Sequence, residues 1–252
     1  MFGRHAQKPG RLITLLAALH TSLIEFALPS LCPLCGRLIH PSNPHVLCPS
    51  CLSGVRFIKP PLCLKCGIPF ASDKEEDHLC GRCLQGMAFY GVARAVCTFS
   101  GSIRQIIHAF KYEGRTRLAR TLVALMEEGP LPLNISRYDR LIPVPLHRNR
   151  LRKRGYNQAL LLARELNRRS RVPIDRTLLR RSKDSPPQIA LTGSRREENV
   201  KGVFSLEGEP RGMTLLLIDD VFTTGATANE CARVLMKGRA RRVDILTIAR
   251  AV

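Results

Sequence analysis

Cysteine pairs are the first residues in this chain whose types and spacing suggest chemistry. Eight of the ten cysteines form four Cys-x-x-Cys pairs, with 12 or 13 residues between the two pairs of each set. The first set is Cys32, Cys35, Cys48 and Cys51, and the second is Cys63, Cys66, Cys80 and Cys83. Four thiolates make a closed tetrahedral zinc site with no open coordination position. We therefore predict two structural Zn²⁺ sites; redox-active pairs, or one zinc ion with four spare thiols, are the alternatives.

The two cysteine sets repeat one pattern with a period near 31 residues, which indicates an internal duplication. A glycine follows the first pair of each set, at Gly36 and Gly67, as a tight turn between ligands requires. We expect each zinc ion to be held within its own half, while a cross-braced pairing between the halves stays open.

Residues 215–228, LLLIDDVFTTGATA, are the second stretch whose residue types and spacing suggest chemistry. Its apolar start predicts a buried strand, two carboxylates follow, and a loop of small residues opens a helix. The backbone N–H groups of such a loop and the helix N-terminus favour phosphate, whereas carboxylates suit ribose hydroxyls, directly or through Mg²⁺. A ribose with a 5′-phosphate meets both demands, and an ordinary N-capped helix is the alternative. The expected ligand-binding residues are Asp219, Asp220, Thr223, Thr224, Gly225, Ala226 and Thr227.

The elements that must position these residues follow an alternating pattern. We predict strands over residues 92–99, 138–146, 213–218 and 243–249. Helices are predicted over residues 102–110, 115–128, 155–169 and 227–237, and a long polar loop over 176–203. This alternation predicts an α/β fold with a parallel sheet flanked by helices. In such sheets ligands bind at the carboxyl ends of the strands, where the two carboxylates are expected.

Composition and charge narrow the classes of function. Hydrophobic residues make up 44% of the 252 residues, which excludes wholesale disorder. Aromatic residues make up 5% and tryptophan is absent, which argues against a surface of stacked aromatics for nucleic acid. The net charge is +20, and residues 91–252 carry 31 of the 40 basic residues. We therefore expect anionic partners.

Three parts are expected along the chain: an amphipathic helix in residues 1–29, a metal module in 30–88 and an α/β domain in 89–252. The apolar run 12–24 has helical spacing, and Glu25 interrupts it before it could span a bilayer. We expect a docking helix without a stable membrane span, and a cytoplasmic protein; a membrane-surface helix and a signal peptide are the alternatives.

The stretch 215–228 closely resembles the signature with which type I phosphoribosyltransferases bind phosphoribosyl pyrophosphate (PRPP). Together with the cysteine module, the chain resembles the ComF family over nearly its whole length, and this resemblance implies that residues 30–88 form a double zinc ribbon. Further matching motifs are Phe99–Gly101, Lys111–Gly114, Pro143–His147, Arg150, Arg154–Gln158, and Gln188 with Leu191, Arg196, Asn199, Gly202 and Phe204.

The resemblance implies a type I phosphoribosyltransferase-like fold and a PRPP site that uses Mg²⁺. It places the pyrophosphate-binding loop in residues 147–155, where Arg150 and Arg154 are the expected ligands; a solvated basic turn is the alternative. It also implies that residues 180–203 form a hood over PRPP, so that Arg196 contacts the pyrophosphate. Asp219, Asp220, Arg154 and Arg196 are thus the expected catalytic residues.

The sequence indicates no acceptor for a transferred phosphoribosyl group. The ComF family is tied to DNA uptake in natural transformation. Two functions are therefore weighed: a phosphoribosyltransferase with PRPP as substrate, and a non-catalytic accessory protein that handles single-stranded DNA with the DNA-uptake machinery. In the second function, PRPP binding is regulatory or vestigial.

Overall fold

The computed structural model of the chain describes residues 30–40, 46–71, 76–86, 88–128, 133–182 and 200–252. The helix expected in residues 1–29 lies outside the described residues, as does Arg196. Within the described part, no helix has the length and apolar character needed to cross a membrane.

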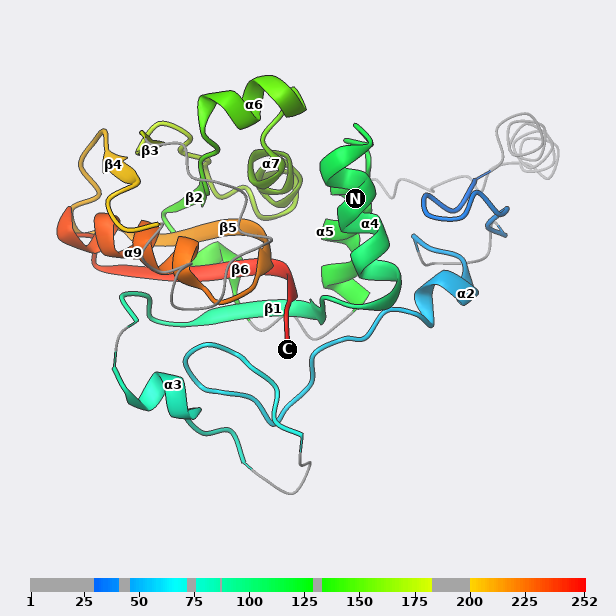
Figure 1. Cartoon of the computed structure of the whole chain (residues 1–252), viewed down its shortest axis with the longest axis horizontal. Coiled ribbons are helices and arrows are strands. Elements are labelled where there is room, and N and C mark those ends of the chain that lie inside the picture. The colour runs from blue at the N-terminus through cyan, green and yellow to red at the C-terminus, as the bar shows by residue number, and fades with distance from the viewer. Residues whose placement is uncertain (1–29, 41–45, 72–75, 87, 129–132, 183–199) are drawn as a thin grey trace, which may run out of the picture.

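Four parallel strands form the central sheet, in the order β1-β6-β5-β2 (Figure 1). The strands are β1 (Ala93–Thr98), β2 (Arg140–Pro143), β5 (Thr214–Phe222) and β6 (Arg242–Arg250). Strand β5 lies between two neighbours, and its apolar run Leu215–Ile218 is fully buried. A continuous apolar run is typical of a strand that is covered on both faces. The predicted parallel α/β fold is therefore confirmed.

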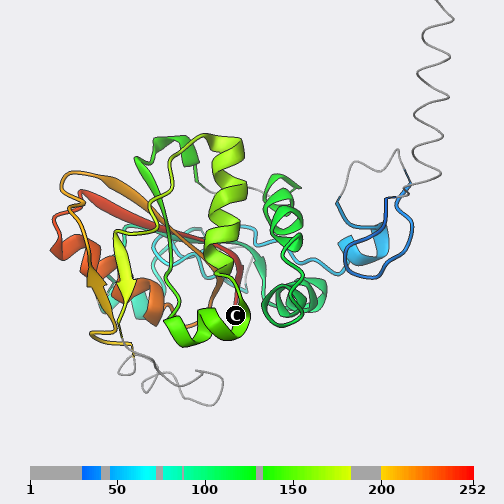
Figure 2. The ribbon, with the colours of Figure 1, turned by 90° about the horizontal axis from the view of Figure 1, so that it is seen from above.

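Helices cover both faces of this sheet. One face carries α4 (Gly101–Tyr112), α5 (Leu118–Glu128) and α7 (Gln158–Ser170). The other carries α9 (Ala226–Lys237) and the antiparallel pair β3 (Leu179–Arg181) and β4 (Phe204–Leu206), as Figure 2 shows. Along β5, Leu216 and Ile218 join the core on the first face, and Leu215 and Leu217 join the core on the second. The alternation follows from the two-residue period of a strand.

Three short helices complete the described elements: α2 (Pro49–Leu52), α3 (Gly81–Leu84) and α6 (Arg148–Arg154), with the 3-10 turn η1 (Ile135–Arg137) before β2. Helices α2 and α3 each begin directly after the third cysteine of a set, Cys48 and Cys80. The duplication seen in the sequence is therefore also a duplication of local structure.

The two cysteine sets sit in two lobes that contact different parts of the α/β domain (Figure 1). The first lobe, residues 30–40 and 46–58, packs against α4, where the carbonyl of Gly54 accepts from the Ser102 N–H at 3.3 Å. The second lobe, residues 61–71 and 76–86, lies beside β1, where the carbonyl of Lys65 accepts from the Ala93 N–H at 2.7 Å. The duplicated halves therefore contact the domain at different places, although residues 56–58 of the first lobe also pair with β1.

Three expectations about local structure need correction. The stretch 176–203 is not a loop throughout, because β3 lies within it and pairs with β4. Residues 148–154 form helix α6 rather than a loop or turn. Strand β5 continues to Phe222, so Asp219 and Asp220 lie inside the strand rather than after it. The last difference has a clear cause, since the strand keeps its pairing with β6 as far as Arg250.

Candidate functional site

A cavity of about 290 Å³ lies at the carboxyl ends of β2 and β5. Its walls come from the end of α4, the segment after β2, helix α6, and the loop between β5 and α9. The predicted site residues among its lining are Arg150, Arg154, Asp219, Asp220, Thr223, Gly225, Ala226 and Thr227. Residues from two separate predicted motifs thus share one cavity.

The two aspartates differ in their electrostatic surroundings. Asp220 is buried, and its Oδ2 lies 2.9 Å from the Lys111 ammonium nitrogen. Burial lowers the pKa of Lys111, but the charge and hydrogen bond of Asp220 outweigh burial and raise it overall. Asp219 is half-buried, and its Oδ1 accepts from the Asp220 N–H at 2.9 Å. Desolvation and the charge of Asp220 raise the pKa of Asp219 to about 7.

The loop between β5 and α9 has the shape of an anion-binding turn. Gly225 caps the helix with φ = 81°, and a Cβ at this position would lie 2.4 Å from the Phe222 ring. Together these facts require glycine, because the left-handed region disfavours a side chain and the close approach of the Phe222 ring leaves no room for a Cβ. The Thr224 hydroxyl accepts from the Ala226 N–H at 3.3 Å. The first turn of α9, with Ala226 and Thr227, faces the cavity.

Helix α6 directs two of its five basic residues at the cavity. Arg150 and Arg154 are partly buried and line it, whereas Arg148, Arg152 and Lys153 are exposed. The spacing of four residues places Arg150 and Arg154 on one helix face. His147 caps the N-terminus of the helix, where its ring Nδ1 accepts from the Asn149 N–H at 3.3 Å, and Gly155 with φ = 82° caps the C-terminus.

Sequence reasoning missed the cationic partner of the acidic pair. Lys111 appeared only as part of a family motif, and nothing in the sequence linked it to Asp220, which lies more than a hundred positions away. Arg181 on β3 also lines the cavity and is buried, with its guanidinium 5.4 Å from the Phe204 ring centroid. Arg181 follows Arg180 in a stretch that was predicted to be a loop, and nothing in its local sequence indicated that its side chain is buried.

Thr224 faces away from this cavity. It lines a second cavity of about 480 Å³ between the loop and the second lobe. Its carbonyl accepts from the Arg82 guanidinium at 3.1 Å. Arg196 lies outside the described residues, so its place relative to either cavity is not described.

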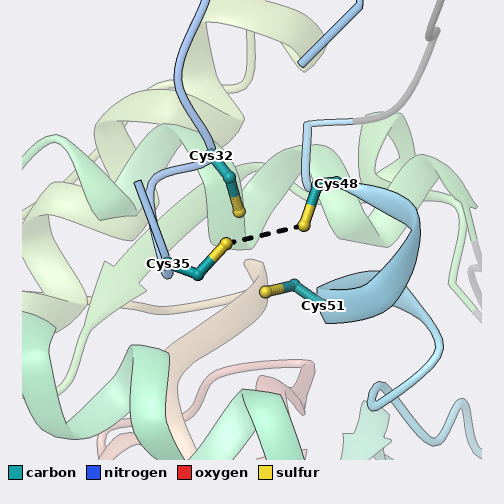
Figure 3. Close-up of side chains that lie close together, drawn as sticks. All are labelled: Cys32, Cys35, Cys48 and Cys51. Atoms are coloured by element: carbon teal, nitrogen blue, oxygen red, sulfur yellow. Dashed lines mark hydrogen bonds between the residues drawn. The ribbon is translucent and has the colours of Figure 1, made fainter. Parts of the chain in front are cut away.

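The two cysteine sets each form a compact tetrad within one lobe. In each tetrad, the four sulfur atoms all lie within 4.8 Å of one another. Figure 3 shows the first tetrad, with its four side chains pointing toward a common centre and with Cys35 Sγ 3.6 Å from Cys48 Sγ. In the second tetrad, Cys66 Sγ lies 3.7 Å from Cys80 Sγ. A tetrahedral zinc ion with Zn–S bonds of about 2.3 Å requires sulfur separations of about 3.8 Å.

The geometry of both tetrads therefore fits structural zinc, and the ligands group sequentially rather than across the lobes. Four thiolates satisfy the ion completely, so neither site offers an open position for a substrate.

Two families match this chain. Residues 23–84 match the family described as "Double zinc ribbon domain", and residues 152–251 match the family described as "Phosphoribosyl transferase domain". Both matches coincide with the structural features above: the first spans the two tetrads, and the second spans the cavity residues from α6 to β6.

Several curated proteins are similar to this chain over most of their length. The DNA utilization protein YhgH of Shigella flexneri is 31% identical, over 89% of this chain and 98% of that protein. Competence protein F of Haemophilus influenzae is 29% identical, over 85% and 97%. Competence protein ComFC of Bacillus subtilis is 28% identical, over 88% and 78%.

Proposed function

Since this chain belongs to the ComF family, we propose that its main cavity binds PRPP with Mg²⁺ and transfers the phosphoribosyl group to an acceptor. One observation carries the proposal. A single cavity combines two carboxylates, the first turn of a helix after a glycine-capped loop, and two inward-facing arginines. Ribose hydroxyls, a 5′-phosphate and a pyrophosphate need these three groups, respectively.

The phosphate end of the ligand fits the loop before α9. The backbone N–H groups of Gly225, Ala226 and Thr227 and the Thr223 hydroxyl would bind the 5′-phosphate, aided by the dipole of α9. The helix has 12 residues, so it is long enough to present this dipole. Thr224 would stabilise the loop rather than contact the phosphate, because it lines the second cavity and not this one.

The acidic pair would hold the ribose. Asp219 is half-buried and faces the cavity, which suits hydroxyl groups or a ligand-bound Mg²⁺, since hard cations prefer oxygen ligands. Asp219 would then help to hold a Mg²⁺ ion that is bound to PRPP, and the ion would offset charge on the pyrophosphate. The Lys111 ammonium, 2.9 Å from Asp220, offsets part of the negative charge of the pair. A neighbouring phosphate can then approach with less repulsion.

The transfer step needs little proton chemistry. The bond from ribose C1 to the pyrophosphate oxygen breaks, the acceptor's nucleophile bonds to C1, and pyrophosphate leaves with the electron pair of the broken bond. Arg150 and Arg154 would stabilise the charge that develops on the leaving oxygens, because fixed cations lower the energy of such a transition state. Arg181, and Arg196 outside the described residues, are further candidates for this role.

Thermal unfolding with PRPP and Mg²⁺ tests the binding step. A ligand at about 100 times its dissociation constant adds about 2.7 kcal/mol to the stability of the native state. For a domain of this size, that corresponds to a rise in Tm of about 5–10 °C. Asp219→Asn should lose most of this shift while keeping the Lys111–Asp220 pair. Ribose 5-phosphate and pyrophosphate, added singly, should give smaller shifts. No shift with PRPP for the wild-type protein would refute the proposal.

Release of pyrophosphate from PRPP, measured with a coupled phosphatase, tests the transfer step. Binding without release in the presence of candidate acceptors would favour a regulatory PRPP site.

Handling of single-stranded DNA is the second candidate function, and the basic surface favours it. Helix α6, which lines the cavity, and helix α7 both carry exposed basic residues: Arg148, Arg152, Lys153, Arg164, Arg168 and Arg169. The relatives' names refer to DNA utilization and competence. We extend that link to this chain as a proposal, with DNA-uptake proteins as partners and the cytoplasm as compartment, where thiols stay reduced.

Binding of a labelled single-stranded oligonucleotide, followed by fluorescence anisotropy over a range of salt, tests this function. Phosphate contacts predict a linear fall of log affinity with log salt. Arg152→Gln with Lys153→Gln should reduce the slope by about two, one unit for each lost phosphate contact. Absence of binding at low salt would rule out direct handling of DNA.

A further inference from the structure

The loop between Phe222 and Ala226, called the phosphate loop here, has the second cysteine lobe directly behind it. Arg82 stands between Cys80 and Cys83, two members of the second tetrad. Its guanidinium Nη2 donates to the Thr224 carbonyl at 3.1 Å. A residue fixed between two metal ligands thus holds the backbone of the loop.

A second connection runs from the same tetrad through the last strand. The Cys66 carbonyl accepts from Arg250 Nη1 at 2.6 Å, and Arg250 Nη2 lies 3.5 Å from the Cys66 sulfur. The buried Arg250 guanidinium also lies 4.7 Å from the centroid of the Phe222 ring. This ring supports Gly225 so closely that no Cβ would fit. Cys66 is therefore linked through Arg250 and Phe222 to the glycine of the loop.

The first lobe makes no equivalent contact among the described residues. At the position that corresponds to Arg82 it has Ser50, which lies between Cys48 and Cys51. Its hydrogen bonds to the α/β domain join other segments: the Gly54 carbonyl accepts from the Ser102 N–H at 3.3 Å, and the Pro33 carbonyl accepts from Arg115 at 2.8 Å. The contacts at the loop are therefore specific to the second lobe and are not a general property of the duplicated module.

We propose that the second metal lobe positions the phosphate loop, with Arg82 and Arg250 as the positioning residues. For ligand binding, this inference rests on the proposed function, whereas the effect on the loop itself does not. A filled tetrad fixes the backbone at Cys66, Cys80 and Cys83, because all three are ligands. Through its hydrogen bond, Arg82 restrains the backbone at Thr224. Through its contact with the Phe222 ring, Arg250 restrains the position of Gly225. The loop is then held in its binding geometry before the ligand arrives, which lowers the ordering cost of binding.

Arg82→Gln tests the inference, with Arg37→Gln as the matched control. Arg37 is an exposed arginine of the first lobe whose side chain donates to Ser50 within the same lobe, at 3.4 Å. Both variants should retain two zinc ions per chain, measured by elemental analysis. Amide hydrogen exchange of a peptide covering residues 222–229, without ligand, should be faster only in Arg82→Gln. The expected acceleration is about threefold to tenfold, where tenfold corresponds to about 1.4 kcal/mol, the size of one net hydrogen bond.

PRPP affinity, measured by calorimetry, should fall by a similar factor in Arg82→Gln and recover in part in Arg82→Lys, which restores a charged donor. Unchanged exchange in the 222–229 peptide would overturn the inference. Equal acceleration in Arg37→Gln, or in peptides throughout the chain, would also overturn it, because both results indicate general destabilisation. If the wild-type protein fails to bind PRPP, the proposed function fails, and the exchange data still decide whether the lobe positions the loop.

Discussion

The neighbouring aspartates of β5 should respond to asparagine substitution in opposite directions. Asp219 is half-buried next to a second carboxylate, and its pKa is raised to about 7. Its ionised form is therefore less favourable in the folded protein than in the unfolded chain. Asp219→Asn removes this unfavourable charge, and the amide oxygen can still accept from the Asp220 N–H. We expect the variant to be more stable than wild type at pH 8 without ligand.

The size of this effect follows from the pKa shift. A rise in the pKa of Asp219 from 3.8 to about 7 corresponds to about 4 kcal/mol, at about 1.4 kcal/mol per pKa unit, when solvent does not screen the charge. Because Asp219 is only half-buried, solvent screening reduces this to about 2 kcal/mol. A gain of this size raises Tm by about 4–8 °C for a domain of this length.

The dependence of stability on pH provides a second test of the direction in which Asp219→Asn changes the free energy of unfolding. An acid whose folded pKa is raised binds its proton more tightly in the native state, so wild-type stability falls as pH rises from about 4 to about 7. Asparagine has no such dependence. The difference in the free energy of unfolding between variant and wild type should therefore be smaller at pH 5 than at pH 8, where it reaches its full size.

Urea denaturation at both pH values, followed by circular dichroism, measures this difference. Asp220→Asn is the matched control, because it leaves the Lys111 ammonium, 22% exposed, without its carboxylate. This variant should lose about 3 kcal/mol. A neutral or destabilising Asp219→Asn at pH 8, or a difference that does not vary with pH, would refute the assignment of a strained acidic pair.

Three further results are expected. The affinity for PRPP with Mg²⁺, measured by calorimetry, should rise with pH through about 7, because Asp219 must lose its proton to bind the cation; a flat profile would contradict this. Arg154→Gln should weaken PRPP binding about tenfold, the value of one charge-assisted contact, whereas the exposed Arg152→Gln on the same helix should leave it unchanged. Gly225→Ala should lower the free energy of unfolding by about 2 kcal/mol or more, because the left-handed backbone and the Phe222 ring both exclude a methyl group; an unaltered urea midpoint would count against the loop geometry.

The sequence alone predicted those elements that a single local pattern, such as an apolar run or a glycine-containing loop, is enough to identify. The buried run Leu215–Ile218 could only be a central strand, and the glycine-containing loop after it could only open a helix. The eight cysteines of the two tetrads were predicted and their sequential grouping was favoured, because every ligand lies within 20 residues of its partners; the cross-braced alternative stayed open until the structure was known. These features depend on contacts that are close in sequence.

Contacts between distant segments were beyond sequence reasoning. Lys111 meets Asp220 because α4 and β5 converge at one edge of the sheet, and no local pattern in either segment indicates the other. The pair β3–β4 was missed because each strand has three residues, too few for an alternating pattern to stand out. The contact between Arg82 and Thr224 depends on how two domains dock, which periodicity does not encode.

Helix α6 has a kinetic consequence for capture of a highly charged ligand. Arg150 and Arg154 share one helix face, so rotation about backbone bonds cannot separate their Cα atoms, as it could in a loop. Only the side chains of Arg150 and Arg154 have to adopt their bound conformations when an anion binds. The exposed Arg148, Arg152 and Lys153 on the same helix add a positive field at the cavity entrance. Long-range attraction of this kind speeds encounter with anions and weakens as ionic strength rises, so the association rate should depend on salt more steeply than the dissociation rate.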